Sequence, residues 1–110
     1  MSLFKQNLLR PPAYSIHEEL FETLLQRPGI RVERIVSTGQ STPEGEWYDQ
    51  SWDEWVLLLS GSALLLFDGE QTPTPLEPGD ALLIPAHRRH RVSATASEMP
   101  TVWLALHFVE

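Results

Sequence analysis

Two stretches of this 110-residue chain decide its fold: residues 45–61 read GEWYDQSWDEWVLLLSG, and residues 79–90 read GDALLIPAHRRH. In each stretch a glycine turn leads into an apolar run that carries polar side chains at a few fixed places. Short apolar runs bounded by turn residues are typical of buried strands. We therefore expect a small β-barrel with a polar site at its mouth.

The chain after residue 29 continues the same rhythm of short strands and turns. Residues 30–37 are rich in β-branched side chains, and two apolar runs meet at Gly61 as a buried hairpin. Further strands are expected over residues 81–86, 90–95 and 101–109. Roughly seven or eight short strands at close spacing favour an all-β fold, a small antiparallel barrel or jelly roll.

The first 29 residues are predicted to form an N-terminal arm and a short helix. Pro11 and Pro12 prevent a helix there, so residues 1–14 are expected to be extended. Residues 15–29 (SIHEELFETLLQRPG) predict a helix that Ser15 and Glu18 cap and that ends at residues 28–29. The chain is then one domain over residues 1–110, with the barrel over residues 30–109.

The expected barrel core follows from the alternation of side chains along each strand. In a strand, residues two apart face the same side of the sheet. Apolar residues that lie two apart in the predicted strands are therefore expected inside the barrel: Val56, Leu58, Leu64, Leu66, Leu82 and Ile84.

Composition limits the partners and the chemistry. The formal net charge of −7 argues against nucleic acid or an anionic membrane as a partner. The chain has no cysteine, so disulfides and thiolate metal sites are excluded. No apolar run approaches the ~20 residues of a membrane span, and the first residues lack the apolar stretch of a signal peptide. We expect a cytoplasmic protein.

The two opening stretches resemble the paired motifs of the cupin family. The first cupin motif ends in a glutamate, six spacers and a glycine, which Glu54 and Gly61 match. The second motif is matched at Gly79, Pro85 and His90. The resemblance covers about residues 30–109 and implies the cupin barrel. It also implies a homodimer.

The chain departs from the family pattern where the first motif has His-x-His. Counting back from Glu54 with three spacers puts that pair at Tyr48 and Gln50, and counting with four puts it at Trp47 and Asp49. The first register gives residues 48, 50, 52 and 54 one parity, so all could face the barrel mouth. The second register needs a bulge before Glu54. The sequence leaves both registers open.

The resemblance implies a divalent metal ion, iron, manganese, zinc or nickel. Glu54, His90 and either Gln50 or Asp49 are the expected ligands, with His87 a candidate fourth where the family has glycine. With fewer imidazoles than the family pattern, binding is expected to be weaker than at a three-histidine site.

Other side chains near these motifs are candidates for catalysis and ligand binding. Tyr48 and His87 could transfer protons. Trp52 could line the pocket, and Arg91 could hold an anionic group by forked hydrogen bonds. Each candidate also has a structural interpretation: Glu54 as a salt-bridged carboxylate, His90 as a turn histidine, and His87 and the neighbouring arginines as solvated turn residues.

Two classes of function follow. The first is a metal-dependent oxygenase, isomerase or lyase that acts on a small, possibly anionic, molecule. The second is a metal-free module that binds a small ligand in a degenerate cupin site. Metal content separates them, and the sequence does not name a substrate, since one barrel supports unrelated chemistries.

Overall fold

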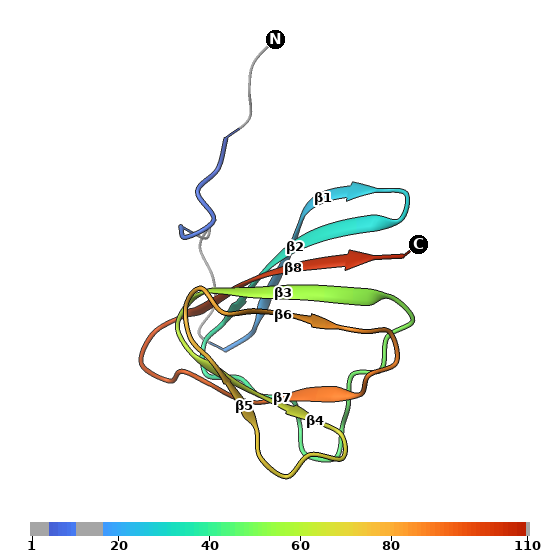
Figure 1. Ribbon diagram of the computed structural model, residues 1–110. Coiled ribbons are helices and arrows are strands. Elements are labelled where there is room, and N and C mark those ends of the chain that lie inside the picture. The colour runs from blue at the N-terminus through green and yellow to red at the C-terminus, as the bar shows by residue number, and fades with distance from the viewer. Residues whose placement is uncertain (1–4, 11–16, 110) are drawn as a thin grey trace.

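The computed structural model describes residues 5–10 and 17–109, and in these residues the protein is all-β (Figure 1). The strands are β1 (Leu20–Arg27), β2 (Ile30–Ser37), β3 (Asp53–Ser60), β4 (Ala63–Phe67), β5 (Thr74–Leu76), β6 (Ala81–Ile84), β7 (His90–Thr95) and β8 (Thr101–Phe108). None of the described residues forms a helix, so this part of the chain holds no helix that could cross a membrane.

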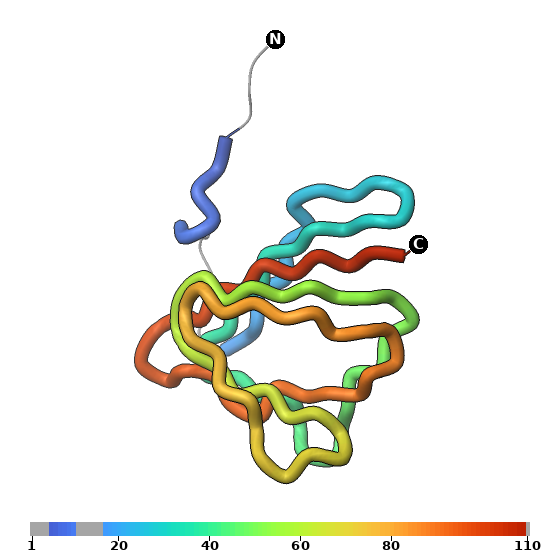
Figure 2. Tube along the Cα trace, in the orientation of Figure 1, coloured from blue at the N-terminus to red at the C-terminus, as the bar shows by residue number. Residues whose placement is uncertain are grey.

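The strands form two antiparallel sheets. The larger sheet has the order β1-β2-β8-β3-β6 and the smaller one the order β5-β4-β7. Figure 2 shows the chain crossing between the sheets after β3, β5, β6 and β7. The expected barrel or jelly roll is therefore present, with its apolar core between the sheets.

The predicted N-terminal helix is wrong where the structure describes it. Residues 20–27 form strand β1, which pairs with β2 through a two-residue turn at residues 28–29. Gly29 has a φ of 82°, which glycine adopts without strain, and this turn folds β1 back onto the edge of β2. The apolar residues of this segment fit a helical period, but pairing with β2 satisfies its backbone. Ser15 lies outside the described residues, as do residues 1–4 and 11–14 of the predicted arm.

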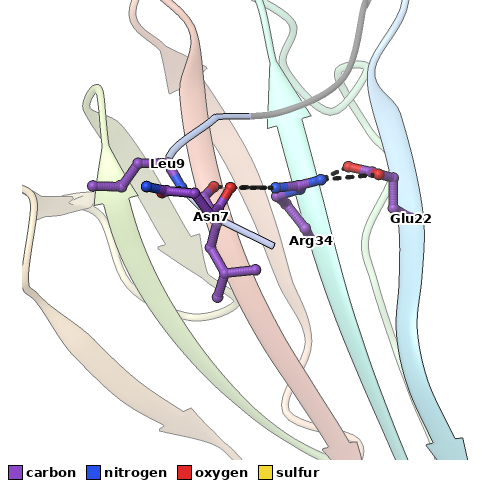
Figure 3. A network of polar contacts seen from close by, with 5 residues as sticks. Asn7, Leu9, Glu22 and Arg34 are labelled. Atoms are coloured by element: carbon purple, nitrogen blue, oxygen red, sulfur yellow. Dashed lines mark hydrogen bonds and ion pairs between the residues drawn. The ribbon is translucent and has the colours of Figure 1, made fainter. Parts of the chain in front are cut away.

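A buried arginine ties the described N-terminal segment to the larger sheet (Figure 3). Arg34 is 2% exposed and donates from Nε and Nη2 to both carboxylate oxygens of Glu22, at 2.7 and 3.0 Å. Its Nη1 donates to the backbone carbonyl of Asn7 at 3.2 Å. The backbone at Asn7 and Leu8 is therefore held beside Arg34, whose parity on β2 is opposite to that of the residues that line the pocket.

The core prediction is right for β3 and β6 and wrong for β4. Val56, Leu58 and Ile84 are buried, and Leu82 packs partly buried against them. In β4 the buried residues are Ala63 and Leu65, whereas Leu64 is exposed and Leu66 half-buried. The cause is an irregularity in the pairing of β3 with β8, between Leu58 and Ser60, which adds one residue and reverses the alternation.

Gly61 is required where β3 turns into β4. Its φ is 86°, and a Cβ placed there would lie 2.3 Å from Oγ1 of Thr101 and 2.6 Å from its Cα. Thr101 is fully buried and its hydroxyl bonds Ser62, so it cannot move aside. The close approach of the two backbones explains the glycine that ends the first motif.

We predict that Gly61→Ala destabilises the protein more than Gly69→Ala does. Gly69 also has a positive φ, 89°, but a Cβ there meets nothing within 4 Å. Both variants carry the backbone strain, and only Gly61→Ala adds an overpacking cost of about 1–3 kcal/mol. Urea unfolding of both variants measures the difference, and equal losses would contradict the steric argument.

Truncating the core at Leu58 should also be costly. Leu58 is 0% exposed, so Leu58→Ala is expected to lower the free energy of unfolding by roughly 2–5 kcal/mol. Leu83→Ala is the matched control, because Leu83 is 53% exposed and its loss should stay within about 0.5 kcal/mol. A loss below about 1 kcal/mol at Leu58 would mean that the register of β3 is wrong.

Candidate ligand-binding pocket

A pocket of about 260 Å³ lies between the two sheets. Its walls are mostly apolar and come from both sheets: Ile35, Val56, Leu65, Ile84, Val92, Trp103 and Ala105. Side chains with polar groups also line it. They come from four strands (β2, β3, β7 and β8) and from the segments that precede β1 and β3: Glu19, Arg31, Glu33, Tyr48, Gln50, Trp52, Glu54, His90 and His107. An apolar cavity with a few converging polar groups is the usual form of a small-molecule site.

The structure decides between the two registers that the sequence left open. Tyr48, Gln50, Trp52 and Glu54 all line the pocket, as the three-spacer register predicts. The backbone of Tyr48 bonds that of His90 in both directions, at 2.7 and 3.1 Å, and their rings stack with centroids 5.6 Å apart. This antiparallel bridge holds the first motif beside the second at the wall of the pocket.

His90 presents one ring nitrogen to the pocket. The imidazole is 5% exposed, and its Nδ1–H donates to the carbonyl of Arg88 at 2.8 Å. That bond leaves Nε2 with its lone pair free, 3.8 Å from Oε1 of Glu54. Burial lowers the pKa of His90, with the charge of Arg88 acting in the same direction, so the neutral ring is favoured.

Glu54 is the carboxyl group that faces this nitrogen. It is 7% exposed, and burial, together with the charge of Glu33, raises its pKa to about 7. Arg31 and a hydrogen bond from Gln50 oppose the rise. The 3.8 Å gap to His90 exceeds a hydrogen bond, so both atoms stay available to a third group. These two atoms are the donors that the predicted metal site would use, and their separation is short enough for both to reach one ion at ~2.0–2.2 Å.

His107 is held by two neighbours. Trp52 donates from Nε1 to its Nδ1 at 2.7 Å, so the proton of the neutral ring sits on Nε2, which faces Oε1 of Glu33 at 3.4 Å. Burial lowers the pKa of His107. His107 is therefore a packed, hydrogen-bonded histidine whose ring also borders the pocket.

Three of the predicted site residues lie away from the pocket. Asp49 and His87 are both exposed, and the imidazole Nδ1 lies 2.8 Å from Oδ1 of Asp49 outside the barrel. Arg91 donates to the carbonyl of Thr42 at 2.8 Å and lies over the ring of Trp47. Their placement gives no support to roles in ligand binding or proton transfer. Asp49 points outward because it alternates with Tyr48 and Gln50, which line the pocket. His87 points to solvent because it lies in a turn, where its φ is 63°.

Sequence reasoning missed two polar residues of the pocket, Arg31 and Glu33. Both lie on β2, and with Ile35 they form the face of that strand that borders the pocket. The signal was available, since two charged residues two apart in a β-branched strand must share a face. That this face would point inward depended on the pairing of β2 with β8.

Comparison with known proteins agrees with this architecture. The family model for the cupin domain matches residues 34–107, which is more than half of the chain. The chain is a cupin. No curated protein matches it.

Solved structures extend the likeness over nearly the whole chain. A protein from Ralstonia eutropha JMP134, provisionally named a mannose-6-phosphate isomerase, is 45% identical, with 97% of this chain and 99% of that chain covered and a TM-score of 0.92. A cupin superfamily protein from Desulfitobacterium hafniense DCB-2 is 21% identical, with 90% and 84% covered and a TM-score of 0.74. The second likeness concerns the fold alone.

Metal binding is common among cupins, so the donor set of this cupin has to be tested against a metal ion. Nε2 of His90 and Oε1 of Glu54 are close enough to share an ion at ~2.0–2.2 Å from each. Among the other polar lining residues, Gln50 offers only an amide, and Glu33 faces Nε2 of His107 at 3.4 Å while Trp52 bonds the other ring nitrogen. Within residues 5–10 and 17–109 no group of three His, Cys, Asp or Glu side chains could hold a metal. A catalytic metal usually needs three such ligands, and these residues do not fit one.

The raised pKa of Glu54 predicts a dependence of stability on pH. Because the folded-state pKa of about 7 lies above the ordinary 4.5, the folded protein binds more protons between these values. The free energy of unfolding should therefore fall as the pH rises from 4.5 to 7, by on the order of 3 kcal/mol from this group. Glu54→Gln should remove the fall, so that the variant is more stable than the wild type at pH 8.

Urea unfolding from pH 4.5 to 8 in the presence of a chelator measures this difference. Glu77→Gln, at an exposed position, controls for the loss of one negative charge. A difference between wild type and Glu54→Gln that does not change with pH would contradict the prediction.

Proposed function

We propose that this cupin binds a small organic molecule in its barrel pocket without a resident metal ion. The observation that carries the proposal is the pair formed by His90 and Glu54. Nε2 of His90 and Oε1 of Glu54 belong to buried residues that line the pocket, and they lie 3.8 Å apart, too far for a bond to each other. A polar group of a ligand placed between them could bond to both, so it is the natural third member.

The pocket limits the size and character of this ligand. A benzene ring fills an apolar cavity of ~150 Å³. A volume of about 260 Å³ then suits one ring, or a branched chain of similar size, with a short polar tail. The aliphatic walls favour an apolar body, and the polar end would lie between Nε2 of His90 and the carboxyl group of Glu54.

A hexose phosphate, the substrate class in the name of the Ralstonia eutropha protein, matches this pocket poorly. Its hydroxyls need many hydrogen-bonding groups, whereas the walls are largely apolar. A phosphate dianion would also lie near Glu19, Glu33 and Glu54 with Arg31 as the only lysine or arginine among the described lining residues. The 45% identity with the Ralstonia eutropha protein therefore supports a similar pocket in the two proteins, and it does not support a hexose phosphate as the ligand of this one.

A second candidate is an isomerase that works by proton transfer, and the same pair of residues favours it. Neutral His90 can accept a proton at Nε2, and protonated Glu54 can donate one from the other side of the gap. A ligand with a C–H bond next to a carbonyl would lose its proton to His90 as Glu54 protonates the carbonyl oxygen. Where the carbon that lost its proton carries a hydroxyl, the product is an enediol. The Glu54 carboxylate then takes the proton of that hydroxyl as His90 returns its proton to the former carbonyl carbon, so the carbonyl moves by one carbon.

The metal-free proposal competes with a metal-dependent enzyme using iron, manganese, zinc or nickel, and metal content tests it. Protein purified without chelators or an imidazole column should contain far less than one of these metals per chain. Incubation with each metal at micromolar concentration, followed by gel filtration, should leave the content unchanged. One metal ion per chain that is lost in His90→Ala would overturn the proposal.

The melting temperature of the same samples separates a structural histidine from a ligand. His90→Ala removes a buried side chain, so its melting temperature should fall while metal content stays the same. His87→Ala is the matched control, because that imidazole is exposed and lies outside the pocket.

A further inference from the structure

We propose that Arg31 anchors a carboxylate of the ligand, so that the molecule bound in the barrel is a ring-sized monocarboxylate. This inference rests on the proposed binding function and names the class of ligand. It starts from Arg31, which is partly buried in the barrel and has no ion-pair partner among the residues that the structure describes.

The guanidinium of Arg31 has no hydrogen-bond acceptor among residues 5–10 and 17–109. Its Nε is buried and donates to no atom of the described residues, and none of their carboxylates forms an ion pair with Arg31. Two other arginines of the barrel do have carboxylate partners: Arg34 pairs with Glu22, and Arg89 pairs with Asp68. A buried N–H of a charged group is costly to leave unpaired, so an acceptor from outside the chain is expected.

The nearest candidate partner on the same strand is already engaged. Glu33 lies two residues along β2 on the same face, and its Oε1 is 3.4 Å from Nε2 of His107. His107 is held in that orientation by Trp52. The guanidinium of Arg31 lies over the ring of Trp52, 5.7 Å from its centroid, which fixes the arginine above an aromatic surface.

The register of the larger sheet places Arg31 about one ligand length away from the polar pair formed by His90 and Glu54. Arg31 pairs with His107, and His107 pairs with Glu54, so the three residues form one row across β2, β8 and β3. Two strand spacings separate Arg31 from Glu54, or about 10 Å between backbones. A ligand whose carboxylate meets Arg31 could therefore extend its body toward His90 and Glu54.

Arg31 also borders a second, more open recess of about 170 Å³. This recess shares Arg31, Trp52 and His107 with the main pocket and continues to the turn between β1 and β2. An anion approaching from this side would meet the guanidinium before it entered the barrel. Arg27 lines the recess as well, so the approach is more positive than the interior.

The charge of the pocket selects a monoanion. Arg31 offers a planar donor group that matches a carboxylate, and no second lysine or arginine of the described residues lines the main pocket. Glu54 lies in the row of Arg31 and Glu33 in the next inward-facing row, and both carboxyl groups repel additional negative charge. A carboxylate can be balanced by the single positive charge of Arg31, whereas a phosphate dianion would need a second positive charge.

Paired probes test this inference. Benzoate, phenylacetate and 3-phenylpropionate, each beside its neutral amide, are titrated into the wild-type protein and binding is followed by calorimetry and by the melting temperature. We expect at least one acid to bind at millimolar concentration or below and its amide to bind at least tenfold more weakly. In Arg31→Gln the affinity for that acid should fall at least tenfold and the preference over the amide should disappear.

Arg91→Gln is the matched control. Its Nε is also buried without a partner, but Arg91 does not line the pocket, so acid binding should stay at the wild-type level. If Arg31→Gln does not fold, Arg31→Lys replaces it, since lysine keeps the charge and loses the forked donor geometry; it should bind the acid more weakly than the wild type.

The outcomes separate the two proposals. Acid and amide that bind equally well to the wild type, or an acid preference that persists in Arg31→Gln, would overturn the role of Arg31 and leave the binding pocket in place. No binding of any acid or amide would overturn both. A lower melting temperature in Arg31→Gln with unchanged acid preference would assign Arg31 a structural role only.

Discussion

The antiparallel register of β8 between β2 and β3 is the constraint on which the pocket depends. It aligns Arg31, His107 and Glu54 in one row, all on the inner face of the larger sheet. Because side chains alternate along a strand, a slip of one residue would turn the row to the outer face. The central strand therefore does more than complete the sheet. It decides which polar groups share the barrel interior.

Within that interior, some polar atoms are satisfied by the protein and others are left to a ligand. His107 is bonded by Trp52 and faces Glu33, and Nδ1 of His90 is bonded to a backbone carbonyl. What remains is Nε2 of His90, the carboxyl group of Glu54 at 3.8 Å from it, and Nε of Arg31. The cupin pattern at this place has imidazoles, and Tyr48 and Gln50 stand there instead. The pocket therefore has fewer metal donors than the family pattern, which supports the proposal of an organic ligand.

Local patterns were enough to predict much of the fold. The apolar runs and glycine turns predicted most strands of the barrel. The alternation along residues 48–54 predicted that residues 48, 50, 52 and 54 share one face, and all four line the pocket. Two predictions failed because local patterns were ambiguous. Residues 20–27 fit a helix or a strand, and the hairpin at residues 28–29 decided for a strand by pairing it with β2. In β4 one additional residue after Leu58 reversed the faces, and a single extra residue leaves no mark in hydropathy.

The sequence by itself determined the cupin barrel and the approach of His90 to Glu54, because the motifs that carry these residues also carry the turns that position them. Only the tertiary structure decided the rest of the site. It turned Asp49 and His87 outward to each other and brought Arg31 into the pocket from a strand outside both motifs. The physical reason is that a pocket collects side chains from strands far apart in the chain. Their pairing is set by long-range register, which no local spacing encodes.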